Sequence, residues 1–249
     1  ILKLIDCSTL TDLSPIEKLT HLEELQIHSC TLLEDLQPLR ALDKLTHLEL
    51  LRCDSLKDIS PLASLSNLEY LVIFKAKDLV DLKPLAKNIS LKKIFLYGCE
   101  SIRDFSPLKD LVNLEVITIP NCQKKLPDIS PLFHLPNLYQ IALDNCYDGI
   151  DLSALNNCKQ LGSLVINYSK SLTIIPDLHF LQNLSDLIIY YCPNIKDLSS
   201  LGHVKALLHL RFRRSCWYVK NIDSLKGLSN LRTLSLEDFH HLENIEAAR

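Results

Sequence analysis

Cysteines recur along this chain at a nearly fixed interval, and they are the first residues that could do chemistry. The segments "LEELQIHSC" (22–30), "LTHLELLRC" (45–53) and "LKKIFLYGC" (91–99) each end in a cysteine. Zinc needs ligands that converge on one point, and the sequence has no C-x₂₋₄-C pair. Nine thiols is also an odd number for a disulfide framework. We therefore expect no metal site and interpret the cysteines as small buried side chains, with disulfides between neighbouring thiols as an open alternative.

Aspartates form a second periodic set. A file of carboxylates could bind cations. An aspartate before a helical turn also accepts backbone N–H bonds, which favour its charged form, and we prefer this structural role. The set comprises Asp12, Asp35, Asp58, Asp81, Asp104, Asp128, Asp151 and Asp197.

Other catalytic patterns are missing from the sequence. The nine histidines show no H-E-x-x-H spacing, the five glycines form no phosphate-binding loop, and no G-x-S-x-G segment occurs. We therefore expect no catalytic residues and no cofactor, and we predict that the chain is not an enzyme.

The elements that must position these residues follow from an internal repeat. The common pattern is L-x-x-L-x-L-x-x-C-x-x-L-x-D-L-x-P-L-x-x-L-x-N, with a spacing of 23 residues and two steps of 24. An incomplete copy, "ILKLIDC", precedes the first full one. The full copies begin at Leu22, Leu45, Leu68, Leu91, Leu114, Leu138, Leu161, Leu184, Leu207 and Leu231.

Each copy predicts one strand and one short turn. The alternating end of L-x-x-L-x-L suits a strand, as in "IFLYG" (94–98) with Ile94 and Leu96 facing inward. Serine before proline, as in "DISPLASL" (58–65), predicts a serine cap and a 3₁₀ or α-helical turn. No single coil can bury its own leucines, so the coils must stack and pair their strands into one parallel sheet.

The repeat resembles the leucine-rich repeat, and its length is most similar to the short internalin-type subclass. "DISPLASLSNL" (58–68) and "DISPLFHLPNL" (128–138) carry the likeness well. The resemblance implies an α/β solenoid, an arc or horseshoe with a concave parallel β-sheet and short 3₁₀ or helical turns on the convex side. It also implies that cysteine takes the slot that usually holds asparagine. We expect residues 1–249 to form one domain of about ten to eleven repeats, as a fragment of a larger protein.

Partner-binding residues are expected on the concave face, where side chains have no role in the core. Exposed aromatic residues there would favour a protein or peptide partner, and an arginine edge would suit a partner with an acidic end. Docking on another domain of the same chain and a functionally neutral surface are the alternatives. The candidates are Leu51, Tyr70, Val72, Phe74, Phe95 and Tyr97; Val165, Tyr168, Ile188, Tyr190 and Tyr191; and Arg211, Arg213 and Arg214.

Charge and composition limit the class of partner and the cellular location. The net charge of −3 argues against nucleic acid or a membrane surface as partner. Unpaired thiols favour a cytoplasmic location, although N-x-S sites occur at Asn88, Asn167 and Asn183. By resemblance, we expect the recognition or sensor domain of a larger intracellular protein, such as a NOD-like receptor of innate immunity or a related signalling ATPase. The alternatives are an internalin-like surface adhesin and a ubiquitin-ligase substrate adaptor.

Overall fold

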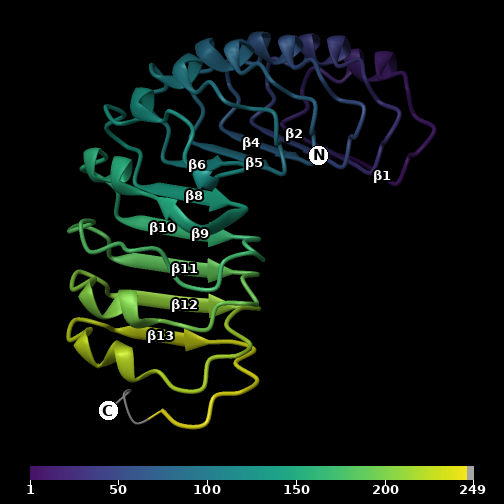
Figure 1. The fold of residues 1–249 in the computed structure, drawn as a ribbon. Coiled ribbons are helices and arrows are strands. Elements are labelled where there is room, and N and C mark those ends of the chain that lie inside the picture. The colour runs from purple at the N-terminus through teal and green to yellow at the C-terminus, as the bar shows by residue number, and fades with distance from the viewer. Residues whose placement is uncertain (246–249) are drawn as a thin grey trace. The chain divides into compact units, whose positions relative to one another are not determined.

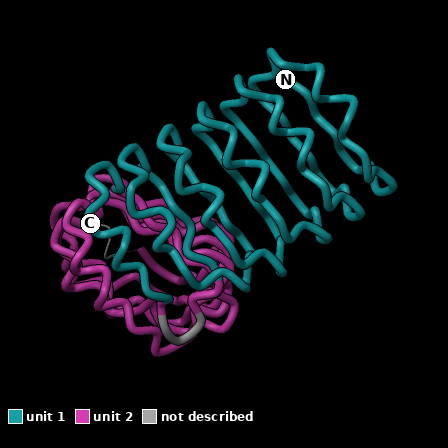
Figure 2. The backbone as a smooth tube through the Cα atoms, turned by 90° about the horizontal axis from the view of Figure 1, so that it is seen from above, with its two compact units in different colours: residues 1–120, 127–138 teal, residues 121–126, 139–249 magenta. Residues whose placement is uncertain are grey.

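The structure, a computed structural model, describes residues 1–245, with the side chains of residues 123–125 left aside. It divides into two compact units (Figure 2). The first unit comprises Ile1–Pro120 and Pro127–Leu138, and the second comprises Asn121–Leu126 and Tyr139–Arg249. The single domain over 1–249 stays a prediction.

The strands of the first unit are parallel neighbours in sequence order (Figure 1). Their register follows the repeat, because Leu25 pairs with Leu48 and Leu71 pairs with Ile94, each 23 residues further along. This confirms the predicted parallel sheet in this unit. The strands are β1 (Leu2–Ile5), β2 (Glu24–His28), β3 (His47–Leu51), β4 (Tyr70–Phe74), β5 (Lys93–Tyr97) and β6 (Val116–Ile119).

The second unit has the same internal arrangement and adds a short side sheet. Its main strands are again parallel neighbours in sequence order. They are β8 (Gln140–Asp144), β10 (Ser163–Asn167), β11 (Asp186–Tyr190), β12 (His209–Arg213) and β13 (Thr233–Leu236). The side sheet pairs β7 (Gln123–Lys125) with β9 (Cys146–Asp151), and β7 lies in the segment 122–129, where the first 24-residue step has its extra residue.

Short 3₁₀ helices lie opposite the strands in most of the coils (Figure 1). Proline stands in the first turn of η1–η6, as predicted, because its fixed φ suits that position. Three later helices form without proline, whereas the coil around Asp177 has turns and no helix. The helices are η1 (Ser14–Lys18), η2 (Gln37–Ala41), η3 (Ser60–Ser64), η4 (Lys83–Lys87), η5 (Ser106–Leu108), η6 (Ser130–Leu132), η7 (Ser153–Asn157), η8 (Ser199–His203) and η9 (Asp223–Gly227). In the described part of the chain, none of the helices has the length and apolar composition needed to cross a membrane.

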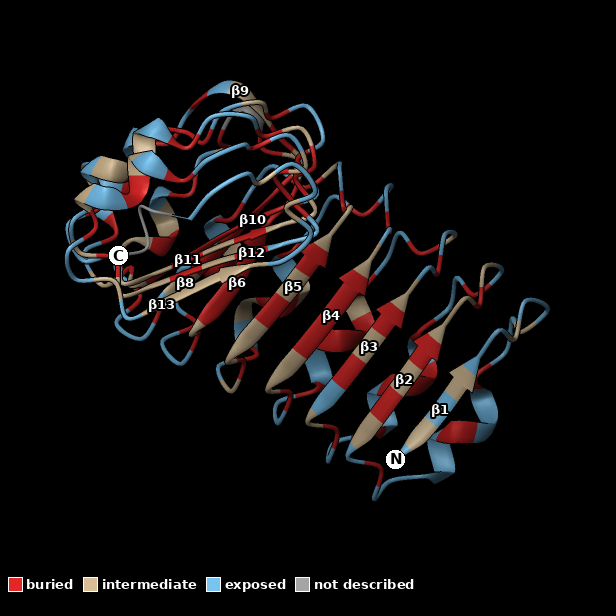
Figure 3. Cartoon of the chain, turned by 90° about the horizontal axis from the view of Figure 1, so that it is seen from below, coloured by how far each residue is buried: buried red, intermediate tan, exposed pale blue. Residues whose placement is uncertain are grey.

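The leucine ladder forms the core of each unit. Ile94 and Leu96 are fully buried, as predicted for β5. Buried and partly exposed residues alternate along β2, β3 and β5, so one face of the sheet packs inward and the other stays open (Figure 3). We call the face of the sheet that does not pack inward the open face.

One or two residues after each strand of the main sheet, the chain has a residue with a left-handed backbone. Its φ lies between 49° and 68° in all eleven repeats, which turns the chain sharply before the cysteine slot. This conformation favours glycine, asparagine and aspartate, yet larger side chains also occupy it. The residues are Asp6, Ser29, Arg52, Lys75, Gly98, Asn121, Asn145, Tyr168, Tyr191, Arg214 and Asp238.

Candidate protein-binding surface

The cysteine slot is confirmed as a buried structural position. The Cys53 thiol can donate weakly to the carbonyl oxygen of Ile27, at 3.6 Å, and to that of Leu51, at 3.9 Å. Cys30, Cys99 and Cys192 repeat the pattern. Where serine fills the slot, the Ser215 hydroxyl donates to the equivalent carbonyls of Ile189 and Arg213. Cysteine and serine therefore add a donor to this slot, whereas Ala76 fills it as a buried side chain without one.

None of the nine cysteines forms a disulfide, and eight of them are buried, while Cys7 is partly exposed. Burial raises the pKa of the Cys53 and Cys192 thiols to about 12 and that of the Cys158 thiol to about 11. These thiols stay protonated at neutral pH and are poor nucleophiles. Among the described side chains, no group of three or more His, Cys, Asp or Glu residues could hold a metal ion.

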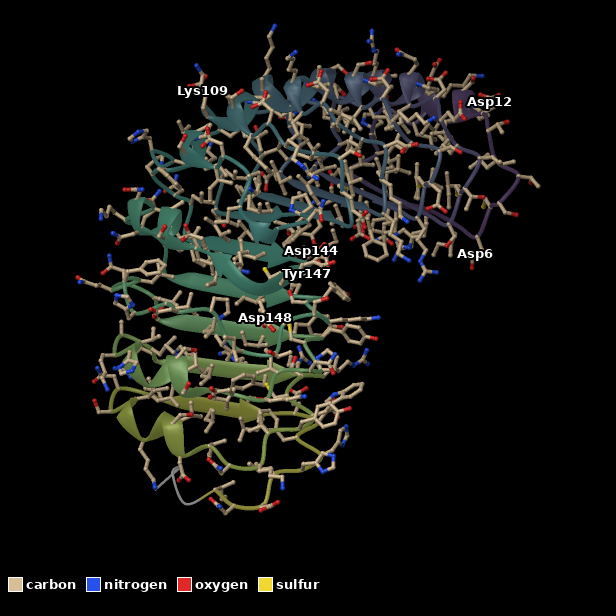
Figure 4. The ribbon with its side chains drawn as sticks, in the orientation of Figure 1. Asp6, Asp12, Lys109, Asp144, Tyr147 and Asp148 are labelled. Carbon is tan, nitrogen blue, oxygen red and sulfur yellow. The ribbon has the colours of Figure 1, made fainter. Side chains whose placement is uncertain are left out.

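The aspartate file anchors the helical turns, which confirms its structural interpretation. Asp58 Oδ1 accepts a hydrogen bond from the backbone N–H of Ser60 at 2.7 Å, and Asp128 accepts one from Ser130 at 2.9 Å. The backbone N–H and hydroxyl of Ser14 both donate to Asp12, and these bonds lower the pKa of that carboxyl (Figure 4). The predicted serine cap is wrong, because serine begins the helix and its N–H donates to the preceding aspartate.

A different aspartate supports the side sheet of the second unit. Both oxygens of Asp148, on β9, accept hydrogen bonds from Thr173: one from its backbone N–H at 2.7 Å and one from its hydroxyl at 2.6 Å (Figure 4). Partial burial raises the pKa of Asp148, but these bonds outweigh burial and lower it. This carboxylate therefore joins neighbouring coils.

The open face of the first unit carries what we call the aromatic row, made of His47, Tyr70, Phe95 and Tyr97. Ring centroids lie 5.5 Å apart between His47 and Tyr70, 5.5 Å between Tyr70 and Phe95, and 5.8 Å between Phe95 and Tyr97. The three predicted aromatic residues are half-buried. Partial burial, and then the Glu49 carboxylate, raise the pKa of Tyr70, so its hydroxyl remains a donor.

The other candidates of the first unit differ in exposure. Leu51 and Phe74 are half-buried on the open face, and the Lys75 ammonium lies 5.4 Å from the Phe74 ring centroid. The prediction that Val72 is exposed is wrong, since it is only 9% exposed. Its short side chain lies between Glu49 and Phe95 in the strand register. Sequence reasoning also missed His47, although the 23-residue spacing places it opposite Tyr70.

The second unit carries what we call the tyrosine cluster, made of Tyr168, Tyr190 and Tyr191. The Tyr168 ring meets the Tyr190 ring edge-on at 5.5 Å and the Tyr191 ring at 5.6 Å. The structure thus brings together three predicted residues, with Ile188 half-buried nearby on β11. Val165 was also expected to be exposed, but it is buried on β10 and is only 8% exposed.

The predicted basic edge is largely neutralised within the chain. Arg211 lies 3.5 Å from the Asp186 carboxylate, and Arg213 lies 3.2 Å from the Glu237 carboxylate. Arg214 is exposed and has no ion pair among the described side chains. Arg211 and Arg213 therefore have less charge to offer a partner than the sequence indicates.

The asparagine side chain is buried in two of the three N-x-S sites of the folded chain. Asn88 is fully buried, and its amide donates to the carbonyls of Leu62 and Leu65. Asn167 is 3% exposed, whereas Asn183 lies at the surface. A glycan could therefore be accommodated on the folded chain at Asn183 but not at Asn88 or Asn167.

Comparisons with known proteins agree with the repeat. No family model matches the chain, and no curated protein matches it. Among solved structures, it resembles an internalin (InlF) from Listeria monocytogenes str. 4b F2365, with a TM-score of 0.61 and 26% identity over 91% of this chain and 64% of that one. The chain thus spans less than two thirds of that structure. Internalin C2 of the same strain supports the fold alone, with a TM-score of 0.54 and 22% identity over 89% of this chain and 83% of that one. The repeat, the strand register and these likenesses identify the chain as a leucine-rich-repeat solenoid of the internalin-like type.

Proposed function

We propose that this chain is the protein-recognition part of an internalin-like protein and that it binds its partner through the open face of the first unit. The main evidence is the aromatic row. Its rings contact one another across β3, β4 and β5, and they take no part in the leucine core. Aromatic side chains bury a large area at little conformational cost, and soluble proteins tend not to leave such patches uncovered. The internalin-like fold is typically non-catalytic, which supports binding over catalysis.

The setting that best fits this function is a surface adhesin of the internalin type. The likeness to the Listeria internalin InlF supports it. The expected settings in a NOD-like receptor, a signalling ATPase or a ubiquitin-ligase adaptor have no support from those comparisons.

One observation favours a second setting, the recognition part of a cytoplasmic protein. None of the nine cysteines forms a disulfide, and many cysteines without disulfides are typical of a reducing compartment. Fractionation of the source cells, with detection of the chain by antibody, separates the two settings. A surface or secreted pool supports the adhesin, and a chain confined to the cytoplasm contradicts it.

The binding function is tested by selecting a displayed library of random peptides on the immobilised chain. Replacing Phe95→Ser and Tyr97→Ser together should weaken binding of the selected peptides by about tenfold, because hot spots at interfaces are commonly aromatic. The melting temperature should change little, since both side chains lie outside the core. Tyr218→Ser is the control, because Tyr218 is an exposed aromatic residue that lies beyond the strands. Unchanged affinity in the double variant would remove the aromatic row as the binding site.

A further inference from the structure

The tyrosine cluster occupies an unfavourable backbone position. Tyr168 and Tyr191 have φ values of 49° and 54°, directly after β10 and β11. Bulky residues adopt this left-handed conformation at a cost, and asparagine adopts it readily. Asn121 and Asn145 occupy the same position in this unit. Two adjacent repeats therefore hold an aromatic ring where a less strained residue would serve the fold.

The rings of the cluster make no contribution to the leucine core. Tyr168 is 38% exposed, and Tyr190 and Tyr191 are partly exposed. The Tyr190 and Tyr191 centroids lie 6.5 Å apart, so the three rings support one another at the end of the strands. Such a cluster forms a firm apolar surface with phenolic hydroxyls.

Two cations close to the cluster in the repeat order lack a carboxylate partner in the described part of the chain. The Lys170 ammonium lies 5.3 Å from the centroid of the Tyr191 ring. Arg214 follows Tyr191 by one repeat at the same left-handed position. Neither has an ion pair among the described side chains, whereas Arg211 and Arg213 both do. Lys170 lies in the same repeat as Tyr168, and Arg214 lies in the repeat after Tyr191, so both unneutralised charges come from the repeats of the cluster or the next one.

We propose that the tyrosine cluster, with Lys170 and Arg214, is a second recognition site, which takes an acidic segment of a partner protein with an apolar side chain next to a carboxylate. The apolar side chain covers the rings, and the carboxylate meets Lys170 or Arg214 as a charge-assisted partner. A protein segment is favoured over a nucleic acid because the chain as a whole has a net charge of −3. This inference rests on the proposed function and adds a site at the strand ends of the second unit.

The test uses two double variants of the full chain. Tyr168→Asn with Tyr191→Asn removes the rings and keeps a residue suited to the backbone. Lys170→Gln with Arg214→Asn removes the two charges. Lys75→Asn is the matched control, because Lys75 holds the same left-handed position in the first unit and also lies beside an aromatic ring.

Random displayed peptides are selected on the parent chain and depleted on the first double variant. We expect the remaining peptides to be enriched in Asp or Glu next to an aromatic or aliphatic residue. A synthetic peptide from this set should bind each double variant about tenfold more weakly, as measured by fluorescence anisotropy. Its binding should weaken with rising salt and be unchanged in the Lys75→Asn control. The asparagine variant should melt no lower than the parent.

Three results would overturn the second site. The first is that no peptide remains after depletion, and the second is that the remaining peptides lack acidic residues. The third is that the chain binds an oligodeoxythymidine as strongly as it binds the peptide. The Phe95→Ser and Tyr97→Ser variant separates this inference from the proposed function. Peptides that lose affinity only in that variant would leave the proposed function intact and remove the second site. No selected peptides on the parent chain would remove both.

Discussion

At the scale of single residues, a carboxylate sets the start of each helical turn. Asp12 and Asp128 accept bonds from the backbone N–H two residues later, and the bonds from Ser14 and Ser130 lower the pKa of each carboxyl. A lowered pKa in the folded chain means that the charged form stabilises the fold. That stabilisation is present above the ordinary value of 3.8 and is lost as the pH falls through the folded value.

Asp128→Asn should reduce the loss of stability on acidification. Asparagine keeps an acceptor for the turn, as Asn221 shows by accepting from the N–H of Asp223 at 3.2 Å, but it has no proton to gain. We expect the urea midpoint of the parent to fall further between neutral pH and about pH 3 than that of the variant. Asp128→Ala, which removes the acceptor, should lower the midpoint at both pH values. Equal pH slopes for parent and Asp128→Asn would contradict this account of the turn.

At the scale of elements, the stacking distance of two 3₁₀ helices depends on glycine. A Cβ added at Gly202, in η8, would lie 2.8 Å from the Ser224 carbonyl oxygen, and one at Gly227, in η9, would lie 2.7 Å from that of Gly202. The Lys205 ammonium also donates to the Gly227 carbonyl at 2.7 Å. Backbone therefore meets backbone here without room for a methyl group.

Gly227→Ala and Gly202→Ala should each destabilise the chain by about 1–3 kcal/mol, the usual cost of overpacking. Helix propensity alone would favour alanine, so a loss of stability identifies the steric cause. Urea denaturation measures the change. Gly162→Ala is the control, because its nearest neighbour would be the Ser185 hydroxyl at 3.8 Å, an ordinary contact. Wild-type stability of Gly227→Ala would mean that the helices can move apart freely.

At the scale of the whole molecule, one slot in the repeat determines the chemistry of the thiols. Seven of the nine cysteines follow the left-handed turn after a strand, and Cys158 lies in an apolar slot. Cys216 itself has a left-handed backbone beside the second inserted residue and is fully buried. Burial makes these side chains hydrophobic filler with a weak donor.

The native protein should therefore react with Ellman's reagent at about one thiol, and the unfolded protein at all nine. Cys7 is the partly exposed thiol, and peptide mass spectrometry after brief alkylation should find the label there. Rapid native labelling of Cys53 or Cys192 would show that the coils open more readily than their packing implies.

The sequence predicted on which face of the sheet the candidate side chains lie, but not how exposed each of them is. Alternation along the strand correctly placed Tyr70, Phe95 and Tyr97 on the open face. It could not show that Val72 is covered, because exposure depends on the lengths of neighbouring side chains. Nor could it show that Arg211 has a carboxylate partner in Asp186, since ion pairing depends on rotamers as well as register.

The sequence by itself determined the repeat, the buried leucines, the small cysteine slot and the aspartate at each turn. These follow from period and side-chain size, because a coil that cannot bury its own leucines must stack on its neighbours in register. Only the tertiary structure decided which faces stay accessible, which cations remain unpaired and which tyrosines meet at a strained turn. Those properties arise between side chains about 23 residues apart, whose contacts depend on conformation rather than on spacing.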